Sequence, residues 1–135
     1  TTFKLNYLFR ELTKNKKLKK IKIDIKGREF LINNFYDGIA KLEFNQLCNT
    51  NIGAEDYIKI ADTCSFIVIQ NIPCFNDENA NQQQRFITLI DILYEKKISI
   101  MISMATRLEN IGSSKKLFLP FKRTLSRIFE LTAPK

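Results

Sequence analysis

Three arginines are the side chains in this sequence that are best suited to phosphate chemistry. Arg85 precedes an apolar stripe with helical spacing, whereas Arg123 and Arg127 are four residues apart, about one helical turn. A guanidinium can stabilise the charge of a phosphoryl group during transfer, as a phosphate sensor or an arginine finger does. An ordinary surface arginine has the same pattern, and Arg127 also has Glu130 as a pairing partner at i+3. We therefore treat the three arginines as candidate catalytic residues, with surface ion pairing as the alternative.

Polar side chains at the ends of two predicted strands form a second candidate site. Gln70 and Asn71 follow the apolar residues 66–69, and Ser103 follows the apolar residues 98–102. Open parallel sheets bind their ligands at the carboxyl ends of the strands. These three residues are therefore candidate cofactor-binding residues, with capping of the sheet edge as the alternative. None of them is acidic, whereas P-loop enzymes usually place a magnesium-binding carboxylate at such a position.

No segment of the chain has the sequence of a phosphate-binding loop. The P-loop pattern G-x-x-x-x-G-K-[ST] is required because its backbone N–H groups surround the phosphates and its lysine reaches them. The four glycines, Gly27, Gly38, Gly53 and Gly112, do not have this spacing. The segment GSSKK, which begins at Gly112, lacks the second glycine and predicts a surface turn. The chain alone is not expected to bind ATP in the P-loop manner.

Several other chemistries are excluded by the histidine and cysteine content. The sequence has no histidine, so Ser-His and Cys-His nucleophile systems are absent. Cys48, Cys64 and Cys74 do not have the spacing of metal ligands, so we expect no metal site. Reduced thiols in a cytosol-like compartment are the simplest interpretation. No apolar run approaches the roughly 20 residues of a membrane helix, so no transmembrane segment is predicted.

A strong positive charge is concentrated near the start of the chain. The net charge is +8, and eight of the fifteen residues from Lys14 to Arg28 are basic. A solvated basic face and an anion-binding patch both fit this pattern. The basic residues alternate with isoleucine and not with the aromatic residues that stack on single-stranded bases. Nucleic acid is therefore not the expected partner.

Residues 1–47 are predicted to form a helix followed by an antiparallel meander. Residues 21–25 alternate between isoleucine and charged residues, which is typical of a half-buried strand. A hairpin turn at residues 26–28 leads into a second strand, residues 33–38 read as a turn, and residues 39–44 alternate again as a third strand. The helix is predicted from four apolar residues at helical spacing, Leu5, Leu8, Phe9 and Leu12.

Residues 48–135 are predicted to form an α/β unit, and together with residues 1–47 they make a single domain of 135 residues. The buried strands at residues 66–69 and 98–102 flank a long helix, which favours a parallel strand-helix-strand unit with a right-handed crossover. The apolar stripe of that helix contains Phe86, Leu89, Ile90, Leu93 and Tyr94. A final helix opens around Pro120, and its predicted core face contains Leu125, Ile128, Phe129 and Leu131.

Three runs of sequence in this order resemble the C-terminal region of the ZapE-type P-loop ATPases, a family that includes the mitochondrial lactation-elevated ATPase. The runs are LCNTNIGAEDYIKIADTCSFIVIQNIP, QRFITLIDILYEKKISIMIS and FKRTLSRIFEL. The similarity covers nearly the whole chain. The matching positions are Phe44, Leu47, Cys48, Asp56, Tyr57, Pro73, Arg85, Phe86, Ile87, Leu89, Asp91, Tyr94, Ser103, Phe121, Arg123, Thr124, Ser126, Arg127 and Glu130.

This resemblance implies part of a P-loop NTPase-like core of the AAA type. The family's Walker A and Walker B elements lie upstream of the matched region, so this chain alone would not be a competent ATPase. The whole protein would use ATP and Mg²⁺, would form an oligomer, and would couple hydrolysis to remodelling a protein partner. By resemblance, that partner belongs to the bacterial cell-division machinery or to membrane-protein quality control. The implied compartment is the bacterial cytoplasm, with the mitochondrial matrix second.

A non-enzymatic protein-interaction module of α/β fold is the alternative function. In that case the meander and the basic residues 14–28 would dock a protein or an anionic surface.

Overall fold

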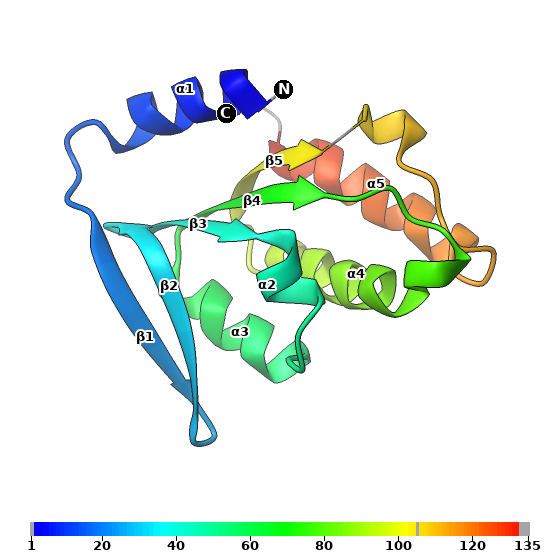
Figure 1. The fold of residues 1–135 in the computed structure, drawn as a ribbon, viewed down its shortest axis with the longest axis horizontal. Helices are drawn as coiled ribbons and strands as arrows, with labels where there is room; N and C mark the ends of the chain where they lie inside the picture. The colour runs from blue at the N-terminus through cyan, green and yellow to red at the C-terminus, as the bar shows by residue number, and fades with distance from the viewer. Residues whose placement is uncertain (1, 105, 133–135) are drawn as a thin grey trace.

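A mixed sheet of five strands forms the centre of the molecule (Figure 1). The computed structural model describes residues 2–104 and 106–132. The strands follow one another in the sheet in chain order, with antiparallel pairing from β1 to β3 and parallel pairing from β3 to β5. The predicted meander and the predicted parallel unit are therefore both confirmed, in one continuous sheet. The strands are β1 Lys19–Ile25, β2 Arg28–Tyr36, β3 Ile39–Glu43, β4 Phe66–Ile72 and β5 Ser99–Met104.

Helices cover both faces of the parallel part of the sheet (Figure 1). Four of them lie on one face, where they enclose the main core, and α1 lies on the other face, where Phe9 packs with Ile39 and Val68. Parallel strands need this double cover because neither of their faces can be left to water. The helices are α1 Thr2–Thr13, α2 Phe44–Cys48, α3 Ala54–Thr63, α4 Ala80–Glu95 and α5 Phe118–Thr132, with short 3-10 turns η1 Asp77–Asn79 and η2 Leu108–Asn110.

Two-residue turns close both hairpins of the meander. Lys26 and Gly27 connect β1 to β2 with φ of 51° and 81°, which confirms the predicted turn. Asp37 and Gly38 connect β2 to β3 with φ of 52° and 95°. Turns with positive φ at both positions match the right-handed twist of the flanking strands.

The second strand is longer than the sequence pattern predicts. Residues 33–38 were expected to be a turn, but β2 continues to Tyr36 and only Asp37 and Gly38 turn. The extension is paired on both sides, because Phe35 lies opposite Ala40 of β3 and Lys19 of β1. This pairing outweighs the low strand preference of asparagine at residues 33–34. The third strand is slightly shorter than predicted, since it ends at Glu43.

Four phenylalanines join the helices to the sheet. Phe44, Phe75, Phe86 and Phe121 are buried, and neighbouring ring centroids lie 5.4–5.8 Å apart. These separations are typical of favourable aromatic pairs. The rings come from α2, the segment after β4, α4 and α5, so one cluster holds these four segments together.

Three of the four predicted core residues of the last helix are confirmed, because Ile128 and Leu131 are buried and Leu125 packs against the core. Phe129 was expected in the core, but its side chain is 57% exposed. The residues of α5 that are buried follow the spacing of one helical face, namely Phe121, Thr124, Ile128 and Leu131. Residue 129 lies about 100° around the helix from Ile128, outside this stripe.

Within residues 2–104 and 106–132, no helix combines the length and the apolar composition that crossing a bilayer requires.

Candidate functional site

The carboxyl ends of the three parallel strands carry a set of polar side chains, which we call the strand-end cluster: Glu43, Gln70, Asn71 and Ser103. Asn71 connects the three strands, because its backbone N–H donates to Ser103 Oγ at 3.0 Å and its Nδ2 donates to Glu43 Oε2 at 2.8 Å. Gln70 lies opposite Glu43 in the register of β3 and β4. The structure therefore brings the three predicted strand-end residues together and adds Glu43, which the sequence analysis did not single out.

A backbone irregularity at Asn71 makes these contacts available. Its φ is 61°, and the pairing of β4 with β5 shifts between Ile69 and Ile72. Asparagine adopts this left-handed conformation more readily than most residues. The bulge lets the Asn71 N–H reach the Ser103 side chain, which is only 6% exposed. Asn71 and Ser103 therefore use their hydrogen bonds to tie the sheet edge together, and Gln70 is half-buried beside them.

A second set of polar side chains joins α4 to α5, and we call it the α4–α5 cluster: Asp91, Tyr94, Arg123, Arg127 and Glu130. Arg127 Nη1 donates to Asp91 Oδ1 at 2.5 Å, and its guanidinium carbon lies 4.6 Å from the centre of the Tyr94 ring. Arg123 Nη2 lies 3.8 Å from the other oxygen of Asp91. One carboxylate on α4 therefore faces both arginines of α5.

Glu130 has a different partner from the one that its spacing suggests. The ion pairs of the described residues connect Arg127 to Asp91 and do not include a pair with Glu130. Glu130 accepts a hydrogen bond from Tyr94, and this bond together with the negative charge raises the pKa of the Tyr94 phenol. The phenol is protonated at neutral pH, as an ordinary tyrosine is, and it acts as the donor.

Arg85 lies apart from the other two arginines and caps a helix. Its Nη1 donates to the backbone oxygen of Cys48 at 3.1 Å, at the carboxyl end of α2. The neighbouring oxygen of Leu47 accepts a hydrogen bond from the Tyr57 hydroxyl at 2.6 Å. Cationic and hydroxyl groups at this position satisfy carbonyls that have no partner inside the helix. The three candidate arginines therefore form two separate sites, one at α2 and one between α4 and α5.

Buried thiols near these sites are not nucleophiles. Burial raises the pKa of Cys48 to about 12, although a hydrogen bond with Tyr57 acts in the opposite direction. Burial likewise raises the pKa of Cys64 to about 12 and also raises the pKa of Tyr57. Only the thiolate is reactive, so both cysteines are inert at neutral pH.

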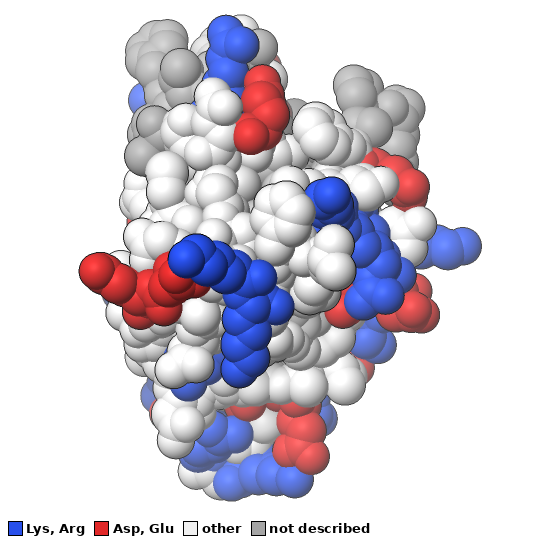
Figure 2. Space-filling view, turned by 90° about the vertical axis from the view of Figure 1, so that its right-hand side faces the viewer, with Lys and Arg blue, Asp and Glu red and all other residues white. Residues whose placement is uncertain are grey.

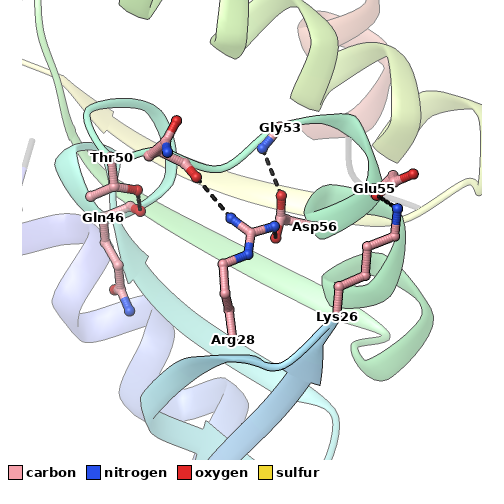
Figure 3. Close-up of polar contacts among 8 residues, drawn as sticks. Lys26, Arg28, Gln46, Thr50, Gly53, Glu55 and Asp56 are labelled. Carbon is pink, nitrogen blue, oxygen red and sulfur yellow. Dashed lines mark hydrogen bonds and ion pairs between the residues drawn. The ribbon is translucent and has the colours of Figure 1, made fainter.

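An ion pair that the sequence analysis missed attaches the β1–β2 hairpin to α3 (Figure 3). Arg28 Nη2 donates to Asp56 Oδ1 at 2.9 Å, and Arg28 Nη1 donates to the backbone oxygen of Asn51 at 2.9 Å. The Asp56 side chain is buried, and its second oxygen accepts the N–H of Gly53 at 2.8 Å. The sequence signal was present but ambiguous, because an acidic residue in the first turn of a helix is explained by the helix dipole alone.

Much of the basic segment at residues 14–28 is neutralised by nearby carboxylates. Lys26 lies 2.7 Å from Glu55, beside the Arg28 pair, as Figure 3 shows. Lys16 and Lys22 also lie within 4.0 Å of acidic side chains. Four of the eight basic residues in this segment thus have ion-pair partners, which favours the solvated face over an anion-binding patch.

Among the described residues, the side of the molecule toward which the arrows of β4 and β5 point shows no continuous basic surface. Figure 2 shows that side, where Lys and Arg side chains stand in separate places with acidic side chains nearby, over a largely uncharged surface. Among the described residues, no group of three or more Cys, Asp or Glu side chains is arranged to hold a metal ion.

The loop that most resembles a phosphate cradle is closed by its own contacts. A Cβ on Gly112 would lie 2.7 Å from the backbone oxygen of Phe75, so this residue marks a close backbone approach. The Ser114 N–H donates to Gln83 Oε1 at 3.0 Å, and the Lys115 N–H donates to Asp77 Oδ1 at 2.8 Å. These N–H groups are therefore occupied, and the residues of this loop do not fit a triphosphate. The predicted surface turn is only partly correct, because Lys115 and Lys116 are exposed whereas Gly112 pairs with Phe75 and Ser114 is buried.

Comparison with known proteins gives a consistent family assignment. The family model described as AFG1-like ATPase matches residues 1–135. Lactation elevated protein 1 homolog B of Danio rerio is 32% identical over 100 residues, which cover 73% of this chain and 20% of that protein. Cell division protein ZapE of Escherichia coli K12 is 27% identical over 90 residues, which cover 67% of this chain and 24% of that protein. No solved structure matches the chain.

An uncharacterized protein of Schizosaccharomyces pombe is 27% identical over 89 residues, which cover 66% of this chain and 20% of that protein. In each case the matched region is about a fifth to a quarter of the relative's length.

Proposed function

Because the chain belongs to the AFG1-like ATPase family, we propose that it forms the C-terminal part of an ATPase whose phosphate-binding elements lie in another part of a longer protein. In this proposal residues 1–135 fold as one domain, and the whole protein hydrolyses ATP with Mg²⁺ to remodel a protein partner. A bacterial cell-division protein is the proposed partner, and the bacterial cytoplasm the proposed compartment. The observation that carries the proposal is the family match along the whole chain, together with the order of its sequence motifs.

The division of labour between the parts follows from what this chain contains. The described residues have no phosphate cradle, since the N–H groups after Gly112 already have partners. Positive charge that stabilises phosphoryl transfer can be supplied by side chains from a separate segment. At least one of the candidate arginines Arg85, Arg123 and Arg127 is the proposed source of that charge. Gln70, Asn71 and Ser103 are proposed to form the sheet edge that faces the nucleotide.

The ATPase activity of the longer protein tests this function. We expect Mg²⁺-dependent ATP hydrolysis by the longer protein and the loss of that activity when residues 1–135 are deleted. Activity that persists at the full rate without residues 1–135 would contradict a catalytic contribution from this part. A stimulation of the rate by the protein partner would support the remodelling role.

A protein-interaction module without enzymatic activity is the second candidate function. It is favoured by three large apolar side chains on α5 that are more than half exposed, Phe118, Leu119 and Phe129. Exposed aromatic side chains are enriched where proteins meet. The coding sequence upstream of Thr1 discriminates the two functions, because an in-frame G-x-x-x-x-G-K-[ST] supports the ATPase and a start at Thr1 supports the module.

A further inference from the structure

The two arginines of α5 differ in how firmly they are held, and this difference assigns them different roles. We propose that Arg123 contacts the terminal phosphate of an ATP bound elsewhere in the longer protein, and that Arg127 is a positioning residue that holds α5 against α4. This inference rests on the proposed ATPase function and selects one of its three candidate arginines.

Arg127 is enclosed by its contacts. Its side chain is 21% exposed, and it donates to Asp91 Oδ1 at 2.5 Å. Its guanidinium also lies over the Tyr94 ring, with 4.6 Å between the guanidinium carbon and the ring centre. A phosphate could bind Arg127 only if both the ion pair and the ring contact were broken. Arg127 therefore serves the packing of the two helices.

Arg123 is held loosely by comparison. Its side chain is 61% exposed, and its nearest acidic oxygen, Asp91 Oδ2, lies 3.8 Å away. Asp91 also accepts the short hydrogen bond from Arg127 on its other oxygen, so its negative charge is shared between two cations. A long and exposed ion pair contributes little to stability. Arg123 can therefore leave Asp91 for a phosphate, which is a stronger partner for a guanidinium.

The surface around Arg123 has the composition of a contact face. Leu119, one turn before Arg123 on the same side of α5, is 73% exposed, whereas the exposed Phe118 and Phe129 lie about 120–140° around the helix from Arg123. The neighbouring Lys122 places its ammonium 4.9 Å from the centre of the Phe118 ring and adds a second positive charge. Arginine and aromatic residues are enriched at the centres of interfaces. Arg123 thus projects beside Leu119 from an exposed side of α5, which another part of the protein can reach.

Arg85 does not compete for this role. Its guanidinium donates to the backbone oxygen of Cys48 at the end of α2, and it is half-buried. Withdrawing it would leave that carbonyl without its cap, which is costly for a buried group. The observed contacts therefore leave Arg123 as the one candidate arginine that combines exposure with a weak resident partner.

Steady-state ATP hydrolysis by the longer protein tests the assignment with three variants. Arg123→Ala is expected to lower kcat by at least about 100-fold, since that is the typical loss when a single charge-stabilising group is removed from a phosphoryl-transfer site. Arg123→Lys is expected to recover less than about a tenth of that activity, because an ammonium lacks the planar fork of a guanidinium. The melting temperature of both variants should stay close to that of the unaltered protein.

Arg127→Lys is the matched control, because it lies on the same helix and keeps a positive charge beside Asp91. Its melting temperature is expected to fall, whereas its kcat should stay within about tenfold of the unaltered protein at a temperature where both are folded. The assignment is overturned if Arg123→Ala keeps its kcat, or if Arg127→Lys loses as much kcat as Arg123→Ala. If the unaltered longer protein hydrolyses no ATP at all, the proposed function fails first and this assignment fails with it.

Discussion

Replacing Arg28 with alanine is expected to lower the free energy of unfolding because it leaves a buried carboxylate without its cation. The Asp56 side chain is 5% exposed and would keep only the hydrogen bond from the Gly53 N–H. Hydrogen bonds to charged groups contribute about 1.5–3 kcal/mol, and the 51% exposure of Arg28 keeps this one below the top of that range. Water can replace the second bond, to the Asn51 oxygen, because that contact is exposed.

The expected loss is therefore about 1.5–2.5 kcal/mol for Arg28→Ala. An unfolding entropy of about 2.1 cal/mol/K per residue converts this loss into a decrease of about 5–9 °C in the melting temperature of a chain of 135 residues. Thermal unfolding followed by circular dichroism measures the decrease directly.

Lys22→Ala is the matched control on the same hairpin. Lys22 is 67% exposed and lies 3.8 Å from Glu29, so its loss should cost less than about 0.5 kcal/mol. A double-mutant cycle of Arg28→Ala with Asp56→Ala then isolates the interaction between the two side chains. If Arg28→Ala and Lys22→Ala melt at the same temperature, the Asp56 carboxylate does not depend on Arg28 and our reasoning is wrong.

Three further outcomes follow from the burial of thiols and phenylalanines. Cys74 is exposed whereas Cys48 and Cys64 are buried, so one thiol per folded chain should react rapidly with a disulfide reagent. Rapid reaction of Cys48 or Cys64 would contradict their burial. Because burial raises the pKa of both buried thiols from 9.0 to about 12, the unfolded chain loses these protons at lower pH than the folded chain does. The two thiols should therefore leave the free energy of unfolding unchanged below pH 9 and lower it between pH 9 and pH 12, by up to about 1.4 kcal/mol per pH unit for each thiol. Urea titrations at each pH measure this free energy. Cys64→Ala should make its decrease with pH shallower. Phe121→Ala should lower the free energy of unfolding by about 3–5 kcal/mol and Phe129→Ala by less than about 0.5 kcal/mol in the same assay. Equal losses would contradict the burial of Phe121 and the exposure of Phe129 on α5.

Local patterns in the sequence were sufficient to predict most of the elements and the parallel unit, but not α2 or the second half of β2. The isoleucines of residues 21–25 alternate with charged residues, and Lys26 and Gly27 form the turn that this pattern requires. The apolar residues 66–69 became a strand buried on both faces, as a continuous apolar run predicts. These predictions succeeded because neighbouring residues determine the periodicity of an element and the conformation of a tight turn.

The failures have a common cause in contacts between distant segments. No residue near Asn33 and Asn34 indicates that pairing with β1 and β3 extends the strand there. Helical spacing alone also did not show that Phe121 is buried in α5 whereas Phe129 is exposed. The partner of Arg127 is 36 residues away in sequence, on another helix, whereas the spacing suggested Glu130. Residue types thus identified the candidate arginines, but only the tertiary structure showed which of them are already engaged.

The strand-end residues were predicted for a physical reason that does not depend on the family. Parallel strands bring their carboxyl ends to one edge, so Gln70, Asn71 and Ser103 had to lie near one another. Their detailed contacts could not be predicted, because the bulge at Asn71 and the hydrogen bond to Glu43 depend on the register of β3 and β4.

Calorimetric titration of Mg·ATP into the 135-residue chain and into the longer protein tests most directly whether this part depends on a phosphate-binding element outside it. We predict saturable binding by the longer protein and no saturable binding by the 135-residue chain at millimolar nucleotide. Tight and Mg²⁺-dependent binding of ATP by the 135-residue chain alone would contradict the account.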